Sequence, residues 1–257
     1  MLKFKITTVI FGLLMANAIT LSFFMPVPWW YFLLLVICYL LMLFYGSYYV
    51  GASFFMPIIC KAKTTEKKIA LSFDDGPNTN TKEILSILES QKVTATFFCI
   101  GKHISMDKDL FQLIYNSGHL IGNHSYSHTI SFDFWSAKKV QQDLERTQAL
   151  IYSLTGQKTN WFRPPFGVST PSIARTVRTM NYKTIGWSIR SFDTMTTDAD
   201  KLFRSVKRQL HPGAIILFHD SQKVTVDMLP RLLQFIKEQG YEIVPLDKLL
   251  HLQAYVN

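Results

Sequence analysis

The feature that most constrains this chain is its uneven distribution of charge. After Lys5, no Asp, Glu, Lys, Arg or His occurs until Lys61, although the 257-residue chain contains 27 Lys and Arg and 18 Asp and Glu. So long an uncharged stretch lacks the charged face that a soluble domain presents to water. We therefore predict an apolar anchor, residues 1–60, followed by one folded domain, residues 61–257.

The apolar anchor divides into two stretches, residues 6–27 and 29–49, around Pro26 and Pro28. Proline removes a backbone donor and breaks a helix. Each stretch has about the 20 residues that a helix needs to cross a hydrocarbon core of about 30 Å. The second begins with Trp-Trp-Tyr, and such aromatic residues are typical of the membrane interface. We predict two transmembrane helices that form a hairpin in the lipid bilayer.

A second interpretation fits the same residues. Lys3 and Lys5 resemble the positive start of a signal peptide, and Ala-Asn-Ala at 16–18 resembles its cleavage site. Residues 29–49 would then act as a stop-transfer helix. Both arrangements leave the domain on the cytoplasmic side, which the lysines after Cys60 also favour. We expect an integral membrane protein whose catalytic domain faces the cytoplasm. Only a single span, with one of the two stretches interfacial or buried, would place the domain outside.

The net charge of +9 does not indicate a nucleic-acid partner. Positive and negative residues are interspersed, and no nucleic-acid-binding motif is present, so we expect none to bind. The lysines that directly follow the anchor are typical of residues that contact anionic lipid headgroups. The three cysteines have no metal-type spacing and predict no disulfide framework.

From residue 68 onward, strand-like and helix-like segments alternate. Strand-like runs are residues 68–73, 94–100, 119–122, 183–187, 214–218 and 241–244, and helical patterns are residues 81–91, 110–116, 136–155, 172–180, 199–210 and 228–239. This alternation predicts a single α/β domain with a parallel sheet or a (β/α) barrel.

Polar residues follow several of these strands, where a parallel sheet gathers its active site. These residues are Asp74 and Asp75 after the first strand, His124 and His128 after the third, Arg163 after a run at 160–162, Asp193 after the 183–187 strand, and His219 after the 214–218 strand. Two imidazoles one helical turn apart can face one ion. With one carboxylate they form a metal site with open positions for water and substrate. The second carboxylate can act as a base and another histidine as an acid, which predicts a metal-dependent hydrolase.

This series of motifs resembles the polysaccharide deacetylase family, the NodB-type carbohydrate esterases. The similar strings are L-S-F-D-D-G-P at 71–77, T-A-T-F-F-C-I-G at 94–101, H-S-Y-S-H at 124–128, R-P-P-F-G at 163–167, W-S-x-x-S-x-D at 187–193 and L-F-H at 217–219. The resemblance covers residues 67–250. It implies a distorted, incomplete (β/α) barrel and the metal-dependent removal of N-acetyl groups from an amino sugar.

The resemblance also implies how the metal and the base are held. Asp75, His124 and His128 match the ligands of a divalent metal ion, expected to be zinc, with cobalt or another divalent ion as alternatives. Asp74 matches the catalytic base, and Arg163 matches the residue that orients it.

The remaining roles concern the acid and the substrate. His219 matches the general acid, and Asp193 matches its partner. The backbone N–H of Phe166 matches the donor to the oxyanion, and Leu217 matches a residue of the acetyl pocket. Pro165 is expected to contact the substrate as well.

One block departs from the family pattern. The family commonly has an Asp three residues before the position of Asp193 and a Trp directly after it, whereas this chain has Arg190 and Thr194. The missing Trp removes a wall of the groove that binds polymers. A lipid-linked amino sugar is therefore an alternative to the polymeric substrates, peptidoglycan and a chitooligosaccharide. The alternatives are a non-catalytic, membrane-anchored carbohydrate-binding protein and a structural membrane protein.

Overall fold

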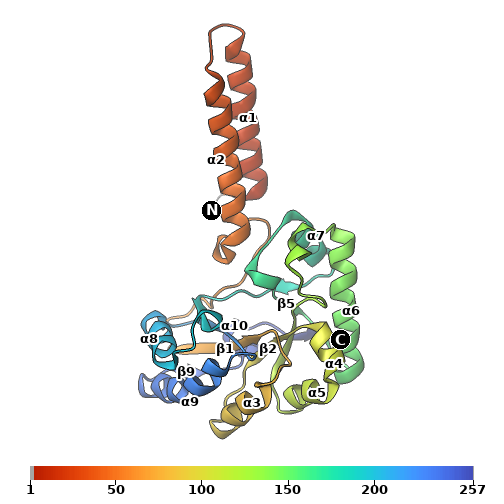
Figure 1. Ribbon diagram of the computed structural model, residues 1–257, viewed down its shortest axis with the longest axis vertical. Helices are drawn as coiled ribbons and strands as arrows, with labels where there is room; N and C mark the ends of the chain where they lie inside the picture. Colours follow the sequence, from red (N-terminus) through yellow and green to blue (C-terminus); the bar gives the residue numbers. More distant parts are fainter. Residues whose placement is uncertain (1–2, 257) are drawn as a thin grey trace.

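Two long helices project from an α/β body (Figure 1). The computed structural model describes residues 3–256. Helices α1 (Phe4–Ser22) and α2 (Trp29–Tyr48) lie side by side and are joined by the turn that contains both prolines. Both helices are long and apolar enough to cross a membrane, and only 11% and 6% of their apolar windows are buried. The pair forms the hairpin that the sequence predicts.

A curled parallel sheet forms the centre of the body. Its strands lie in the order β6-β5-β3-β2-β1-β8-β7, and β9 pairs with β1. The strands are β1 (Lys68–Asp74), β2 (Thr96–Cys99), β3 (Leu120–Asn123), β5 (Trp161–Phe162), β6 (Lys183–Thr184), β7 (Ile189–Arg190), β8 (Ile215–His219) and β9 (Glu242–Ile243). Strands β4 (Lys158–Thr159) and β10 (Tyr255–Val256) form a separate antiparallel pair. The fold is an incomplete (β/α) barrel, as predicted.

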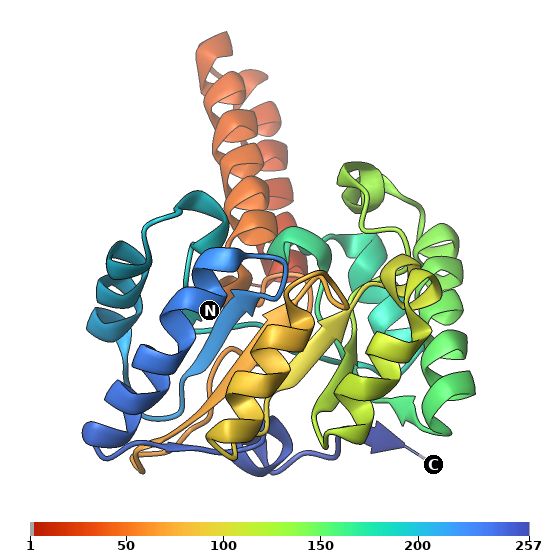
Figure 2. The ribbon, with the colours of Figure 1, turned by 60° about the horizontal axis from the view of Figure 1, so that its bottom comes forward.

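Helices cover the outer face of this sheet (Figure 2). They are α3 (Thr81–Ser90), α4 (Gly101–Met106), α5 (Lys108–Asn116), α6 (Ala137–Thr155), α7 (Pro171–Thr179), α8 (Ala199–Gln209) and α9 (Lys223–Glu238). Helix α10 (Leu246–Leu250) packs instead on the inner face, where Leu246 and Leu249 are buried with Ala70 and Phe98. The ends of α6 follow from its sequence: the Ser136 side chain accepts a hydrogen bond from the Lys139 N–H, and Gly156 closes the helix in the left-handed region. Phe73 and Phe97 stack in the main core between sheet and helices.

The segment between α2 and β1 packs into the body. Val50, Met56 and Ile58 are buried in one hydrophobic cluster of the body. Ile59 forms a bridge with Ile185, just after β6, and Lys61 forms a bridge with Ala214, just before β8. Because β6 and β8 lie near opposite ends of the strand order, the segment spans the open seam of the barrel. The division into an anchor to residue 60 and a domain from residue 61 stays a prediction.

The strand predicted at residues 183–187 is wrong: it is shorter than expected, and a further strand that was not predicted follows it. The strand expected at residues 183–187 ends at Thr184, and a second strand, β7, pairs with β8 at the other end of the sheet. Gly186 lies where the chain leaves β6, and a Cβ there would be 2.8 Å from Cys60 Sγ. Between β6 and β7 the chain crosses from one edge of the sheet to the other, past the close contact at Gly186. Asp193 therefore follows β7 and not the strand that was expected at residues 183–187.

Candidate active site

The side chains of Asp75, His124 and His128 meet at the carboxyl ends of β1 and β3. Their candidate ligand atoms all lie within 4.8 Å of one another. Asp75 Oδ1 lies 3.5 Å from His124 Nε2 and 3.4 Å from His128 Nε2. Asp75 and His128 have positive φ angles of 73° and 44°, in a region that non-glycine residues occupy at a cost and that is concentrated at functional sites. The two histidines lie in a loop after β3 rather than on a helix, so the loop conformation brings them together.

His124 is oriented by a backbone carbonyl. The residue is 2% exposed, and its Nδ1 lies 2.8 Å from the carbonyl oxygen of Arg163. When Nδ1–H donates to that oxygen, the lone pair of Nε2 faces Asp75. A second hydrogen bond of this kind commonly fixes the tautomer of a metal-binding histidine.

These three residues fit a divalent cation. Among the described residues, Asp75 Oδ1 is a buried carboxylate oxygen without a hydrogen-bond donor. Burial acts to raise the pKa of Asp75, but His124, His128 and His219 outweigh it and hold that pKa well below its ordinary value. Burial and the charge of His124 lower the pKa of His128 to about 4, so its ring is neutral at pH 7. Burial acts to lower the pKa of His124, but Asp74 and Asp75 raise it, so a metal ion would have to displace the proton of that ring. An ionised carboxylate and a deprotonated imidazole nitrogen are what metal binding requires.

Asp74 is held by a buried arginine. Arg163 is 0% exposed, and its Nη1 donates to Asp74 Oδ1 at 2.7 Å and to Ser72 Oγ at 2.9 Å. Its other nitrogens donate to the carbonyl oxygens of Ile185 and Gly186. The second carboxylate oxygen, Asp74 Oδ2, lies 3.8 Å from His124 Nε2. One oxygen of Asp74 is thus occupied by Arg163, and the other faces the histidine cluster.

His219 lies at the end of β8, directly beside Asp74 in the strand register. Its Nδ1 lies 2.8 Å from Asp193 Oδ1, and its backbone N–H donates to Asp193 Oδ2 at 2.7 Å. Thr225 Oγ1 on α9 donates to the same Oδ2. Burial acts to lower the pKa of His219, but Asp193, with Asp74 and Asp75, raises it to about 9. His219 is therefore protonated at neutral pH.

The expected substrate-binding residues surround this cluster. Phe166 is 45% exposed, and its ring centroid lies 4.6 Å from that of His128. Its φ of 57° lies inside the short 3₁₀ turn η3 (Pro165–Gly167), in which Pro165 is buried. Leu217 is buried on β8 and alternates onto the same face as His219. Their roles toward a substrate stay predictions.

Ser72, Thr225 and Asp220 also lie at the site, although none of them was predicted as a functional residue. Ser72 lies inside the first quoted motif, so alternation along β1 could have indicated that it faces Arg163. Thr225 has no local signal, because it reaches Asp193 from a helix 32 residues further along the chain. Burial raises the pKa of Asp220 to about 7, and Thr81 donates to this carboxyl at 2.5 Å.

Arg190, which departs from the family pattern, packs against aromatic rings. Its guanidinium carbon lies 5.8 Å from the ring centroid of Trp187 and 5.1 Å from that of Phe192. Phe192 is 49% exposed and, like Phe166, has a positive φ. A pocket of about 260 Å³, lined on one side by Asp75 and His128, opens beside the cluster. The exposed ring that lies against the cluster is that of Phe166, whereas Phe192 lies beside Arg190.

The comparisons with known proteins agree with the observed fold. The family model described as polysaccharide deacetylase matches residues 61–185. The structure of PdaA from Bacillus subtilis, a family 4 carbohydrate esterase, is 30% identical, covers 75% of this chain and 84% of that chain, and has a TM-score of 0.69. The chain belongs to the polysaccharide deacetylase family. The predicted family, fold and enzyme class, a hydrolase of amide bonds on carbohydrates, are confirmed.

The relatives of this chain include both an enzyme and a pseudoenzyme. The peptidoglycan-N-acetylglucosamine deacetylase PgdA of Listeria monocytogenes is 33% identical over 78% of this chain, which spans only 42% of that protein. A family pseudoenzyme from Bacillus anthracis is 29% identical, covers 75% of this chain and 68% of that chain, and has a TM-score of 0.71. The fold therefore occurs in catalytic and non-catalytic members, and the side chains at the site must decide between them.

Proposed function

We propose that this chain hydrolyses the N-acetyl group of an amino sugar of the peptidoglycan type, releasing acetate and a free amine. The observation that supports this best is the different surroundings of two adjacent carboxylates. Asp74 is bound to Arg163 through one oxygen, whereas Asp75 turns a buried, undonated oxygen toward two imidazoles. Such a division gives neighbouring carboxylates separate roles as base and as metal ligand. The relatives' activities favour an amino sugar of the peptidoglycan type over a chitooligosaccharide.

Asp75, His124 and His128 would hold a divalent ion, zinc or cobalt. When bound there, such an ion supplies Lewis-acid polarisation of the acetamide carbonyl and lowers the pKa of water. Donation from His124 Nδ1 to the Arg163 carbonyl and the positive φ of Asp75 and His128 fix the ligands before any ion arrives. The ligand set is therefore preorganised by the loops after β1 and β3.

The chain's own residues carry the proton transfers. Asp74 Oδ2, the oxygen that Arg163 leaves uncovered, accepts the proton of the attacking water. The N–H of Phe166 donates to the developing oxyanion. His219, protonated and held by Asp193, gives its proton to the departing sugar nitrogen, so that the C–N bond breaks to a neutral amine. Phe166 and Phe192 offer faces for the sugar ring.

The hairpin, we also propose, anchors the enzyme in a membrane, with residues 61–257 as the catalytic domain. The low burial of α1 and α2 supports this, because core helices of a soluble protein are mostly buried. A hairpin returns the chain to the side on which it started, so Lys3, Lys5 and the body lie on one side of the bilayer. The positive-inside rule then favours the cytoplasmic side. A signal sequence remains the competing assignment for α1.

Acetate release by the full chain in detergent tests the proposed reaction. The substrates are peptidoglycan fragments, chitooligosaccharides and a polyprenyl-linked N-acetyl sugar, each with added zinc or cobalt and with chelator. Asp74→Asn should reduce the rate about 10²–10⁴-fold, the usual contribution of a general base, while metal content is unchanged. Asp75→Asn should lose metal and activity together. Wild-type protein that binds metal and releases no acetate from any substrate would instead favour the non-catalytic, carbohydrate-binding alternative.

A further inference from the structure

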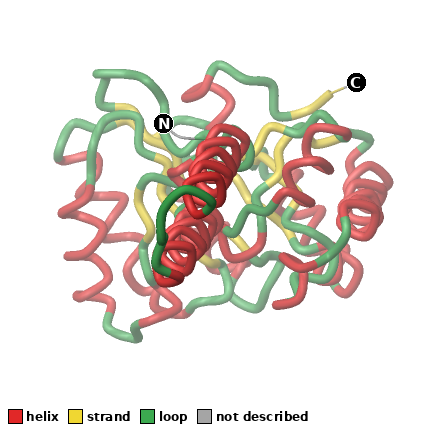
Figure 3. Tube along the Cα trace, turned by 90° about the horizontal axis from the view of Figure 1, so that it is seen from above, coloured by secondary structure: helices red, strands yellow, loops and turns green. Residues whose placement is uncertain are grey.

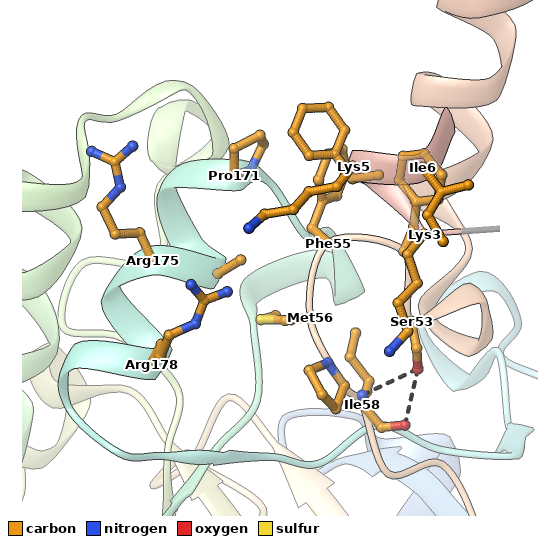
Figure 4. Close-up of a pocket in the computed structure, with 14 residues that line it drawn as sticks. Lys3, Lys5, Ile6, Ser53, Phe55, Met56, Ile58, Pro171, Arg175 and Arg178 are labelled. Carbon is orange, nitrogen blue, oxygen red and sulfur yellow. Dashed lines mark hydrogen bonds between the residues drawn. The ribbon is translucent and has the colours of Figure 1, made fainter. Parts of the chain in front are cut away.

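A second pocket lies where the hairpin joins the body, away from the residues proposed for catalysis (Figure 4). Its volume is about 670 Å³. The first turn of α1, the segment 53–58 and helix α7 form its walls. Phe4 joins the first turn of α1 to the segment 53–58, because its N–H donates to the Phe54 carbonyl and its ring centroid lies 5.0 Å from that of Phe55. The pocket is therefore built from the base of a candidate membrane helix and the body.

The side chains that line this pocket are apolar or positively charged. Lys3 and Lys5 come from the start of α1, and Arg175 and Arg178 come from α7, whereas no Asp or Glu lines it. Figure 4 shows the Lys5 side chain reaching toward α7, with the Arg178 guanidinium on the α7 side. Among residues 3–256, none of these cations has an acidic partner within 4.0 Å. The pocket thus gathers positive charge that the described chain leaves uncompensated.

The start of α1 adds to this charge. The N-terminal end of a helix carries a partial positive charge from its unpaired N–H groups, and α1 begins here without a side-chain cap. The wall opposite is apolar, since Phe54, Met56, Ile58 and Ala174 are buried there. A ligand that fits must carry negative charge on one part and apolar groups on another.

We propose that this pocket binds the phosphate headgroup of an anionic membrane phospholipid, with the start of its acyl chains against the apolar wall. An apolar helix of the hairpin ends at the pocket, so a lipid beside that helix brings its headgroup to Lys5 and Arg178. Guanidinium and ammonium groups form short, strong hydrogen bonds to phosphate oxygens. This proposal rests on insertion of the hairpin into a bilayer and is independent of the deacetylation.

Native mass spectrometry of the full chain in detergent, titrated with phosphatidylglycerol or with phosphatidylcholine of the same acyl chains, tests the proposal. We expect phosphatidylglycerol to bind about tenfold more tightly than phosphatidylcholine. Both lipids carry a phosphate, but the quaternary ammonium of choline adds a positive charge beside the cations of a pocket that no Asp or Glu lines. The double variant Lys5→Gln/Arg178→Gln should lose that preference. A matched variant, Lys201→Gln/Arg204→Gln, removes two exposed cations from α8 and should keep it.

Several outcomes would overturn the assignment. One is equal binding of the two lipids by the wild-type chain, which needs no variant to be folded. Another is a phosphatidylglycerol affinity of the pocket double variant equal to that of the wild type. Displacement of the lipid by millimolar inorganic phosphate would indicate a site for free anions, and binding of a polyprenyl phosphate alone would indicate a substrate site. Acetate release by each variant, measured separately, reports on the proposed reaction.

Discussion

Asp74 and His219 are register partners on the adjacent strands β1 and β8, and each is held by its own buried partner. Arg163 donates to Asp74 at 2.7 Å, and Asp193 lies 2.8 Å from His219 Nδ1. The parallel register therefore brings the proposed base and the proposed acid to the same edge of the sheet. Because the two partners are themselves buried, the positions of base and acid are set before a substrate binds.

Arg163→Ala should strongly destabilise the protein. The guanidinium is fully buried and donates to Asp74, Ser72 and two backbone carbonyls, so its removal leaves a buried carboxylate unpaired. Breaking a buried ion pair in this way lowers the free energy of unfolding by about 3–5 kcal/mol. Urea denaturation measures the change, and Arg204→Ala, an exposed arginine on α8, should stay within about 0.5 kcal/mol of wild type. Equal effects of the two substitutions would contradict the buried pair.

Asp193→Asn should shift the alkaline limb of the pH–rate profile. His219 acts as an acid only when protonated, and Asp193 is the main group that raises its pKa from 6.5 to about 9 against the effect of burial. Activity should therefore fall as the pH rises through the folded pKa. In Asp193→Asn the fall should occur at lower pH, nearer 6.5. Acetate release between pH 5 and about 10 measures it.

Thr225→Val is the control for that experiment. It removes one hydrogen bond to Asp193 and leaves the carboxylate charge beside His219. The alkaline limb should then move much less than in Asp193→Asn. An unchanged limb in Asp193→Asn would show that His219 is not the titrating acid.

Gly46→Ala should loosen the junction between hairpin and body. Gly46 lies near the end of α2, and a Cβ there would collide with the Phe54 ring. The same turn of α2 also holds the loop that follows η3, because the Ser169 N–H donates to the Ser47 carbonyl at 3.0 Å. We expect faster proteolysis of the junction and a lower rate of acetate release.

Gly12→Ala provides the matched control on the other helix of the hairpin. A Cβ at Gly12 meets nothing within 4 Å among the described residues. Alanine also favours a helix by about 1 kcal/mol over glycine. Gly12→Ala should therefore leave proteolysis and activity at the wild-type level. A similar loss in both variants would indicate damage to the hairpin in general and none specific to the junction.

Removal of residues 50–60 should destabilise the body. A chain that starts at residue 61 lacks the buried side chains of Val50, Met56 and Ile58 and the bridge from Ile59 to Ile185. Each buried side chain contributes about 1.5–3 kcal/mol, so the loss amounts to several kcal/mol. Urea midpoints of chains starting at residues 50 and 61 measure the difference. Equal midpoints would mean that the segment only lies against the body.

The sequence was sufficient for the parts of the structure that depend on local patterns. The hairpin with its break at the prolines, the bounds of α6 between Ser136 and Gly156, and the motif residues at the strand ends all follow from local chemistry. Spacing alone was misleading for His124 and His128, because four residues fit a helix as well as the loop that they occupy.

Long-range contacts could not be predicted in the same way. Strand β7 has only two residues and is set by its pairing with β8, so no local pattern indicates it. Thr225 reaches Asp193 from a separate helix, and the segment 50–60 contains the same apolar residue types as a membrane span although it packs in the body. In each case tertiary contacts decide a structure that composition leaves open.

The bridges from Ile59 to Ile185 and from Lys61 to Ala214 determine how far the enzyme can reach. Seen from above, the two helices of the hairpin stand over the body (Figure 3). A flexible tether would let a catalytic domain sample a volume that grows with the length of the tether. Here the chain passes from α2 into the sheet without a free segment, so the active site keeps one height and one tilt relative to the hairpin. A substrate must therefore reach the active site at this fixed distance from the hairpin. Chemically identical sugars that lie farther from the hairpin are left unmodified.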